Sequence, residues 1–584
     1  MNRDFGVALI MIPFQMNIAG LHIADIGVLA LYLTGMVVIG LWSARKIKTS
    51  ADFFMPRRFG KTMMIMFSFG AGTHSDQAVS VASKSFTNGL SGIWYQWLWL
   101  PVTPFFWLIA PVFRRFRAIT TADVFEARFN QSVAMLYAVV GIFILMVTTG
   151  VMLKGSGEVI SASTRGLLSA NLAIAVMTVI FVIYGVAGGL GAAIVTDFIQ
   201  GILTIIFSFL LLPLILNAVG GMDGIRQAIK DPQMLSLIAP AEINLFYIVV
   251  IAFNALVGIV VQPHTMGNCA ACKTEIEGRV GFMFGPLIKR LCTIPWCLTG
   301  LAAVVLFAGK DIEPDKVFGA VAGHFLPRIS PGILGVFLAA VLASVMSSCD
   351  AFMISSSALF TENVYKPLLH NKADKHYIAV GRITSVVVVA GGVGFAYWLP
   401  GVVAGLEIFW KIASMIGIAF WLGLFWRRTT PAGAWAATLT AFGIWWLTSQ
   451  PFFISFMSNF PGAESLRFVI EKNAGPEIFL PWQMVFYLVS GSLAGIIVSL
   501  FTRLVDSEKL DNFYALVRTP IRPGEKVTAP CTLPAGAIVP KKRNIFPSTS
   551  LEIMVPSRVS IIGFLIGWAC VAVIIYTVYL IASV

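Results

Sequence analysis

Long apolar segments recur along the whole chain and constrain its fold more than any other feature of the sequence. From Ile23 to Val584, apolar windows alternate with short polar stretches. A helix of about 20 apolar residues matches the thickness of a bilayer. The sequence therefore predicts an all-α integral membrane protein with about 14 transmembrane helices. The windows lie near 23–42, 62–86, 93–113, 130–153, 167–188, 192–218, 243–265, 280–308, 331–360, 377–399, 403–426, 430–449, 482–502 and 559–582.

The placement of the basic residues indicates that the formal net charge of +13 reflects membrane topology rather than affinity for nucleic acid. Only 12% of the residues are charged, and most of the 41 Lys and Arg fall in alternate loops, among them Arg57, Arg114, Arg427 and Lys541–Arg543. Loops rich in Lys and Arg stay on the cytoplasmic side of a membrane. The pattern predicts a multi-pass protein of the cell (plasma or inner) membrane with both termini outside. We expect lipid as its environment and no nucleic-acid partner.

The ninth window carries polar residues that lipid cannot solvate. Within Leu338–Tyr365 stand Ser344, Ser347, Ser348 and Asp350. In a membrane such groups must face protein, an ion or a water-filled cavity. Two interpretations are open: small hydroxyl residues let helices pack closely, and several oxygens together are ligands for a hard cation.

The second window combines glycine with a polar cluster. Its sequence FSFGAGTHSDQ places Gly70 and Gly72 just before His74, Ser75, Asp76 and Gln77. Glycine weakens a helix, and a broken helix exposes carbonyl and N–H groups that bind ions and solutes. We expect a discontinuous helix that lines a cavity; the alternative is a kinked packing helix.

Few other residues suggest chemistry. Asp197 lies inside a window and is either a structural partner or part of an ion path. The seven cysteines show no disulfide framework. We find no nucleophile–base pair or metal cluster that would indicate an enzyme.

Several motifs together resemble the sodium:solute symporter family. They are SADFFMPRR after the first window, NGLSGIWYQW, TADVFEARFN, YGVAGGLGAAIVTDFIQ, VVQPH, the serine-rich ninth window ending in TENVY, and GLFWRRTTPAGAWAA. Each motif is weak, but their order and spacing are specific. The match runs from about Asp25 to Asp506, and VVQPH is nearer the proline/pantothenate-type branch than the sugar branch.

The resemblance implies a LeuT-type core of two inverted five-helix repeats, each with a broken first helix. It also implies a sodium site between that broken helix and the serine-rich helix. Carried over to this chain, the sodium ligands match Ser344, Ser347 and Ser348, with carbonyls near His74 and Gln77. Asp76 matches an acidic position that serves sodium in proline-transporter-like members, and Asp197 matches the family's Thr-Asp-x-x-Gln motif. We take both as candidates for ion coupling.

The resemblance and the loop lengths together divide the chain into four regions. Residues 1–22 form an N-terminal outer segment, and 23–502 form the transporter domain, with core repeats at about 62–218 and 243–426. Residues 503–558 form a cytoplasmic linker, either a simple tether or a regulatory docking site. Residues 559–584 form a C-terminal transmembrane helix.

Some residues depart from the family pattern or mark the solute path. Lys84, His74 and Asp350 stand where the family usually has small, neutral or apolar residues. We take Ser75, Lys84, Gln262 and Asp350 as candidates for the solute path. Lys84 could attract a carboxylate or extend to the outer surface.

The functional hypothesis is a secondary active transporter that couples Na+ to the uptake of a small polar organic solute, with an amino acid or small carboxylate favoured. A proton-coupled or uncoupled transporter of the same fold and a transporter-like membrane sensor are the alternatives, because His74 could carry a proton. No obligate protein partner is evident.

Overall fold

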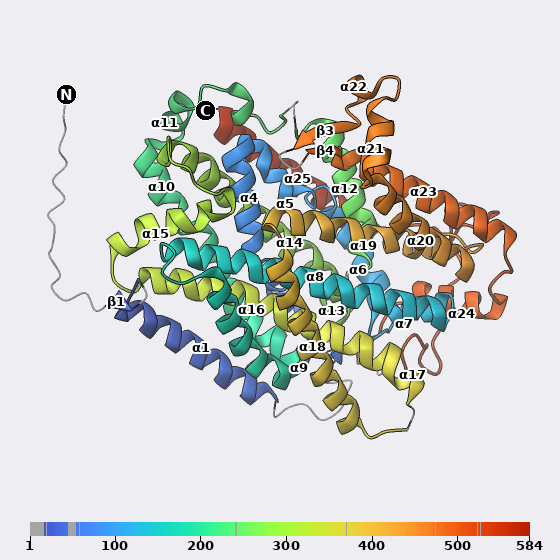
Figure 1. The fold of residues 1–584 in the computed structure, drawn as a ribbon. Helices are drawn as coiled ribbons and strands as arrows, with labels where there is room; N and C mark the ends of the chain where they lie inside the picture. The colour runs from blue at the N-terminus through green and yellow to red at the C-terminus, as the bar shows by residue number, and fades with distance from the viewer. Residues whose placement is uncertain are drawn as a thin grey trace, which may run out of the picture.

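The computed structural model is almost entirely helical (Figure 1). It describes residues 17–18, 20–44, 54–57, 59–239, 242–369, 371–472, 475–522, 524–525 and 527–583. Within helices, the side chains at 40–41, 43–44, 184–189, 192 and 583 lie outside this description. The predicted outer segment 1–22 falls mostly outside the described residues.

Eight helical stretches among the described residues are long and apolar enough to cross a membrane. They belong to α8 (Gln131–Ser163), α9 (Ala170–Phe209) with α10 (Leu212–Val219), α14 (Glu275–Leu306), α16 (Ile333–Phe360), α18 (Asp374–Trp398), α19 (Val402–Phe425), α23 (Leu480–Phe501) and α25 (Arg558–Ser583). A bent pair, α12 (Leu245–Ile259) and α13 (His264–Ala270), makes up to nine. The structure thus supports a multi-span helical protein, and the count of about 14 stays a prediction.

The remaining helices are shorter, and two small hairpins complete the chain. The helices are α1 (Ile23–Ala44), α3 (Lys61–Gly70), α4 (Ser75–Asn88), η1 (Gly89–Ile93), α5 (Trp94–Trp97), α6 (Thr103–Arg115), α7 (Thr121–Arg128), α11 (Gly221–Ala228), η2 (Pro232–Leu235), η3 (Pro314–Lys316), α15 (Val317–Ile329), η4 (Thr361–Tyr365), α17 (Lys366–Leu368), α20 (Pro431–Thr448), α21 (Pro451–Ser458), α22 (Ala463–Leu466) and α24 (Ser507–Arg518). The strands β1 (Asn17–Ile18) and β2 (Leu21–His22) pair antiparallel, as do β3 (Val469–Lys472) and β4 (Gly475–Ile478).

Two helices are interrupted near the middle of the bundle. Between α3 and α4 the chain leaves the helix at Ala71 and re-enters it after His74, as the Gly70–Gly72 pattern predicts. Between α12 and α13 the axis turns by 73°. Pro263 stands at this second break, and proline removes the N–H that a continuous helix would need.

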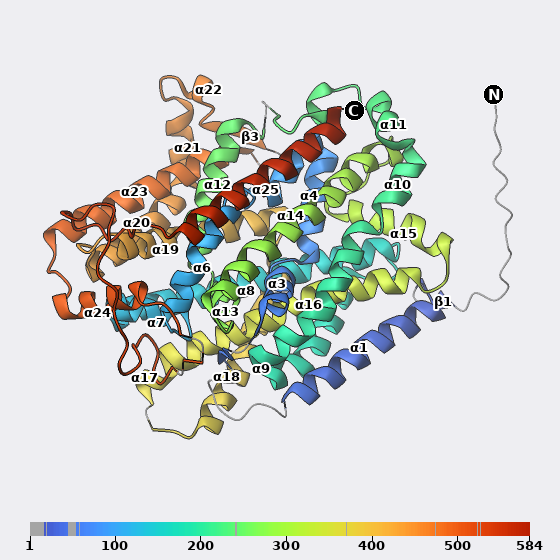
Figure 2. The same cartoon turned by 180° about the vertical axis from the view of Figure 1, so that it is seen from behind.

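Helix α16 is the central element of the bundle. In its apolar window 89% of the residues are buried, against 28–33% for peripheral spans such as α18, α23 and α25. It packs against α1, α8, α9, α15 and α18. By contrast, α25 lies on the outside, against α6 and α14 (Figure 2). A helix this buried presents its polar side chains to protein rather than to lipid.

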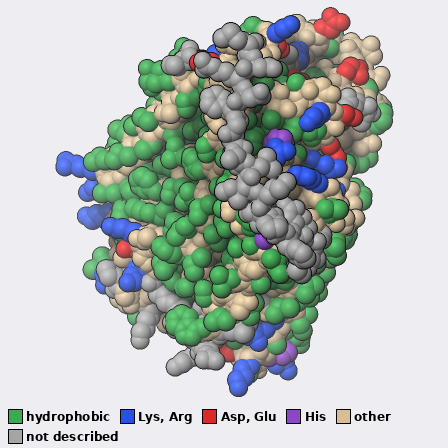
Figure 3. Space-filling view, turned by 90° about the vertical axis from the view of Figure 1, so that its left-hand side faces the viewer, with side chains coloured by type: hydrophobic (Ala, Val, Ile, Leu, Met, Phe, Trp, Pro, Cys, Tyr) green, Lys and Arg blue, Asp and Glu red, His purple; other side chains and the backbone are tan. Residues whose placement is uncertain are grey.

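The molecular surface has the pattern of a membrane protein. Figure 3 shows a broad area of hydrophobic side chains, with Lys and Arg gathered toward its borders. Large apolar side chains of the spans are exposed on the molecular surface, for example Val179, Val387 and Leu565. Because lipid tails cannot hydrate charges, such a belt is what a bilayer requires.

Candidate functional site

Hydroxyl groups of α16 meet the end of α3 at the first helix break. The Ser348 hydroxyl donates to the Gly70 carbonyl at 3.2 Å and to the Ser344 carbonyl at 3.3 Å. The Ser347 hydroxyl donates to Asp197 Oδ1 at 2.5 Å. Three helices therefore contribute to one oxygen cluster, which consists of Gly70, Asp197, Ser344, Ser347 and Ser348 and which we call the serine cluster.

Gly70 allows this close approach because it has no side chain. A Cβ at this position would lie 2.9 Å from Ser347 Oγ and 3.4 Å from Asp197 Cβ. Distances this short leave no room for alanine without displacing a neighbour. The glycine therefore serves helix packing as well as the break.

The serine cluster has the composition of a site for a small hard cation. Its members are fully buried, and its polar atoms are carbonyl, hydroxyl and carboxylate oxygens. Asp197 Oδ2 has no hydrogen-bond partner among the described residues. An unpaired buried carboxylate oxygen is costly and fits a cation as its missing partner.

His74, Asp76 and Gln77 form a second cluster at the start of α4. The His74 ring is hydrogen-bonded to Asp76, and Gln77 Nε2 lies 3.0 Å from His74 Nε2 and 3.3 Å from the Gly72 carbonyl. The described hydrogen bonds join none of these three side chains to the serine cluster. The carbonyl that the structure brings to Ser348 is that of Gly70, so sodium ligation by His74 or Gln77 stays a prediction.

Lys289 of α14 is a charged residue at the break that sequence reasoning missed. Its ammonium donates to the Gly72 carbonyl, and the residue is only 7% exposed. In the sequence it is a basic residue inside an apolar window, next to Arg290. The sequence signal that could have identified it is its position far from any loop, because a lysine inside a membrane has a high free-energy cost unless it has a partner.

Several buried polar atoms near the two breaks lack a hydrogen-bond partner among the described residues. They include Asp76 Oδ2, Gln77 Oε1, Gln96 Oε1, Gln262 Nε2 and His264 Nδ1. The Gln96 carbonyl accepts from Arg290 Nη1 at 2.7 Å, and Arg290 follows Lys289. Ser75 Oγ is 2.7 Å from Ser156 Oγ on α8 and so is already paired.

Lys84 and Asp350 lie in different environments. Lys84 is half-buried toward the far end of α4, with its ammonium 5.1 Å from the centroid of the Tyr95 ring. The Tyr95 hydroxyl in turn donates to Glu407 at 3.0 Å. Asp350 is 2% exposed, three residues beyond Ser347 on α16, and interacts electrostatically with Asp197. Asp350 therefore belongs beside the serine cluster, whereas Lys84 does not.

A small cavity lies beyond the serine cluster. Pro263 and Gly267 line it from the second break, and Ile354, Ser355 and Ala358 line it from α16. The His264 ring packs on Phe352 with centroids 4.9 Å apart, which ties α13 to α16. Both helix breaks thus border the central helix.

Two broken helices around a buried oxygen cluster, within a bundle of spans, define a membrane transporter of the discontinuous-helix class. The sodium:solute symporter family model matches residues 53–441. The chain belongs to this family. Family membership and the relatives below support Na+ as the coupling ion.

Relatives carry different solutes. An osmoregulated proline transporter of Bacillus subtilis (strain 168) is 26% identical over 81% of this chain and 94% of its own length. A sodium/glucose cotransporter of Vibrio parahaemolyticus is 24% identical over 71% and 83%, and the sodium/pantothenate symporter of Escherichia coli (strain K12) is 23% identical over 70% and 87%.

Solved structures have the same fold. A Na+-coupled sialic acid symporter aligns with a TM-score of 0.64 at 19% identity, over 83% of this chain and 98% of that chain. A nucleobase-cation-symport-1 family transporter aligns with a TM-score of 0.51 at 14% identity, over 79% and 98%. Both alignments support the transporter fold expected from the sequence.

Proposed function

We propose that this protein is a secondary active transporter that couples the entry of Na+ to the uptake of a small polar organic solute. The serine cluster is the observation that carries the proposal. It gathers buried oxygens from three helices, and one of them is the broken helix. An ion held there binds α3 to α16 directly, so its affinity depends on how those helices are arranged.

We assign the sodium site to the Gly70 and Ser344 carbonyls, the Ser347 and Ser348 hydroxyls and the Asp197 carboxylate. His74, Asp76 and Gln77 belong to the solute side of the break in this assignment, because their hydrogen bonds connect them to one another and to Gly72. Asp197 provides the carboxylate for the ion in this assignment, while Asp76 is hydrogen-bonded to the His74 ring.

The solute site lies around the unwound residues between α3 and α4. Each buried polar atom without a partner costs about 1–3 kcal/mol, and a polar solute would supply the missing hydrogen bonds of Asp76, Gln77, Gln96 and Gln262. Lys289 adds a buried positive charge within reach of the same segment. This combination favours a solute with a carboxylate, such as an amino acid or a small organic acid.

Transport requires that ion and solute bind one arrangement of the helices more tightly than the other. The Ser348–Gly70 contact and the Lys289–Gly72 contact end on the same unwound segment. Ion and solute therefore act on one movable element. A membrane potential adds about 2.3 kcal/mol per charge per 100 mV to the uptake of Na+.

The protein resides in the cell membrane in this proposal, with both termini outside and residues 503–558 inside. Labelling of single cysteines in intact cells, at a linker position such as Phe546 and at Ser465 in α22, tests this orientation. The linker cysteine must stay protected from an impermeant reagent while the cysteine in α22 reacts.

Reconstituted uptake tests the function itself. A panel of amino acids, small carboxylates and sugars is screened for thermal stabilisation of the purified protein in sodium against choline. The stabilising solutes are then offered to proteoliposomes with an imposed sodium gradient. Accumulation only with the sodium gradient supports the proposal.

The hydrogen-bonded pair of His74 and Asp76 favours proton coupling as a second candidate. Accumulation that ignores sodium and follows a pH gradient would support that candidate instead. Binding without accumulation would indicate a sensor.

A further inference from the structure

The cavity beyond the serine cluster lies toward the linker (residues 503–558). Ser355 lines it seven residues after Ser348 on α16, which is about 10 Å along a helix axis. The cavity is also lined by Phe54 and Met55, which precede α3, and by Ile119 and Thr120, which precede α7. The second of these short segments is next to the linker, because Arg117, two residues before Ile119, contacts Glu525.

Arg57 joins these two short segments. Its Nη2 donates to the Arg117 carbonyl at 2.9 Å and to the Ala118 carbonyl at 2.7 Å. Arg57 is two residues from Met55, and Ala118 is next to Ile119. The guanidinium therefore links the two segments that line the cavity mouth.

Arg117 presents its carbonyl to Arg57 from an unusual backbone conformation. Its φ of 56° lies in the left-handed region, which side chains other than glycine rarely adopt. The Arg117 side chain is fully buried: its Nη1 donates to the Arg115 carbonyl at 2.8 Å, and its other nitrogens make a two-point contact with Glu525. The distances are 2.5 Å from Nε to Oε1 and 3.1 Å from Nη2 to Oε2.

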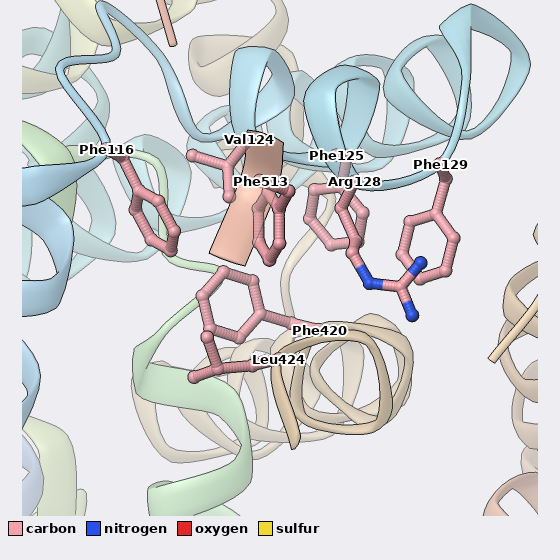
Figure 4. A pocket seen from close by; sticks show the side chains of 8 residues that line it. All are labelled: Phe116, Val124, Phe125, Arg128, Phe129, Phe420, Leu424 and Phe513. Carbon is pink, nitrogen blue, oxygen red and sulfur yellow. The ribbon is translucent and has the colours of Figure 1, made fainter. Parts of the chain in front are cut away.

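Glu525 belongs to the linker, outside the part of the chain that the family model covers. The linker is firmly attached around it. Phe513 of α24 fills one side of an aromatic cavity against Phe116, Phe125 and Phe420 (Figure 4). Close to Glu525, the backbone N–H of Ile521 donates to Glu275 at 3.0 Å.

We propose that Glu525 is a positioning residue for transport: it holds Arg117 in the conformation that lets Arg57 close the cavity mouth. The linker thereby sets how readily the ion site opens toward its own side of the membrane. The inference rests on the proposed function, because opening toward the linker is one of the two states that a transporter must visit.

The test measures access to the cavity in the full-length protein. Ser355→Cys places a thiol in the cavity, and its rate of modification by a water-soluble maleimide is followed in nanodiscs containing sodium. For each variant, the rate measured in the same protein with Ser355 intact is subtracted, so that native cysteines do not contribute. Glu525→Gln is compared with Asp511→Asn, which removes the same charge from an exposed linker residue paired with Arg427.

We expect Glu525→Gln to raise the modification rate roughly tenfold, as loss of a charge-assisted contact implies, and Asp511→Asn to leave it unchanged. Glu525→Asp, which keeps the charge but shortens the reach, gives an intermediate rate. A cysteine at Ser465, on the opposite face, reacts at the same rate in all variants, whereas general loosening would raise it too.

Equal rates for Glu525→Gln and Asp511→Asn overturn the inference. If Glu525→Gln fails to fold, an unchanged rate in Glu525→Asp overturns it. Failure of the proposed function gives a different result: replacing sodium by choline would then leave the Ser355→Cys rate unaltered in every variant, whatever the effect of Glu525.

Discussion

Replacing Ser348 by alanine is the most direct test of the proposed sodium site. The substitution removes a hydroxyl that contacts the Gly70 carbonyl at 3.2 Å and the Ser344 carbonyl at 3.3 Å. It leaves both carbonyls in place but deletes one neutral oxygen from the serine cluster. The expected result is weaker sodium binding in a protein that still folds.

The size of the effect follows from the value of one contact to a charge. Such a contact contributes about 1.5–3 kcal/mol, and each 1.4 kcal/mol is about a factor of ten in affinity. We therefore expect the sodium concentration at half-saturation to rise roughly 10- to 100-fold.

The assay is thermal unfolding of the purified protein over a sodium series, with choline holding the ionic strength constant. A ligand that binds only the folded state raises its stability with concentration, so the midpoint of the series reports the affinity. The matched control is Ser356→Ala. Ser356 is equally buried on the same helix, and its hydroxyl donates only to the Met353 carbonyl at 2.9 Å.

If Ser348→Ala titrates with sodium as Ser356→Ala does, the serine cluster is not the sodium site. Equal loss of thermal stability without sodium in the two variants is expected and does not bear on the site. Only the sodium dependence separates them.

Three further predictions concern the break and the linker. Gly70→Ala places a Cβ 2.9 Å from Ser347 Oγ and should weaken sodium binding in the same titration, whereas Gly35→Ala, whose Cβ has no neighbour within 4 Å, should not. Lys289→Gln should abolish stabilisation by carboxylate solutes in the solute panel while leaving the sodium midpoint unchanged; loss of both responses would contradict separate sites. Burial opposes the charge of Glu525, but its bonds to Arg117 outweigh burial and lower its pKa below 4.5. The stabilisation that the Glu525–Arg117 contact adds is therefore full above pH 4.5 and is lost as pH falls through the lowered value. Pepsin cleavage of the linker, relative to an unfolded reference peptide, should rise only below that range, and cleavage independent of Glu525→Gln would refute this.

Features encoded locally could be read from the sequence. Gly70 and Gly72 next to four polar residues gave the discontinuous helix, because glycine and unsolvated polar groups both disfavour an unbroken span. The serines of α16 could be named as candidate ion ligands through the family resemblance, and this role stays a prediction. The structure brings Ser348 to the Gly70 carbonyl of the broken helix and Ser347 to Asp197.

Features that depend on tertiary contacts could not be predicted from the sequence. The family resemblance pointed to carbonyls near His74 and Gln77, and their role as ligands stays a prediction. The carbonyl that the structure brings to Ser348 is that of Gly70, because the path of the unwound residues is decided by packing against α16. The role of Lys289 could not be predicted for the same reason, because its partner, the Gly72 carbonyl, lies 217 positions away in the chain. The partner of Lys84, the Tyr95 ring, likewise comes from a separate helix.

The unwound segment between Gly70 and His74 gives a physical reason for coupling. At one end the Gly70 carbonyl meets Ser348 of the most buried helix, and two residues later the Gly72 carbonyl meets Lys289 of α14. A cation in the serine cluster and an anionic group at Lys289 would each change the balance of charge on the same few carbonyls. At these two proposed sites, neither could bind without altering the segment that the other contacts. With both sites where we propose them, coupling needs no long pathway, because ion and solute share one piece of backbone.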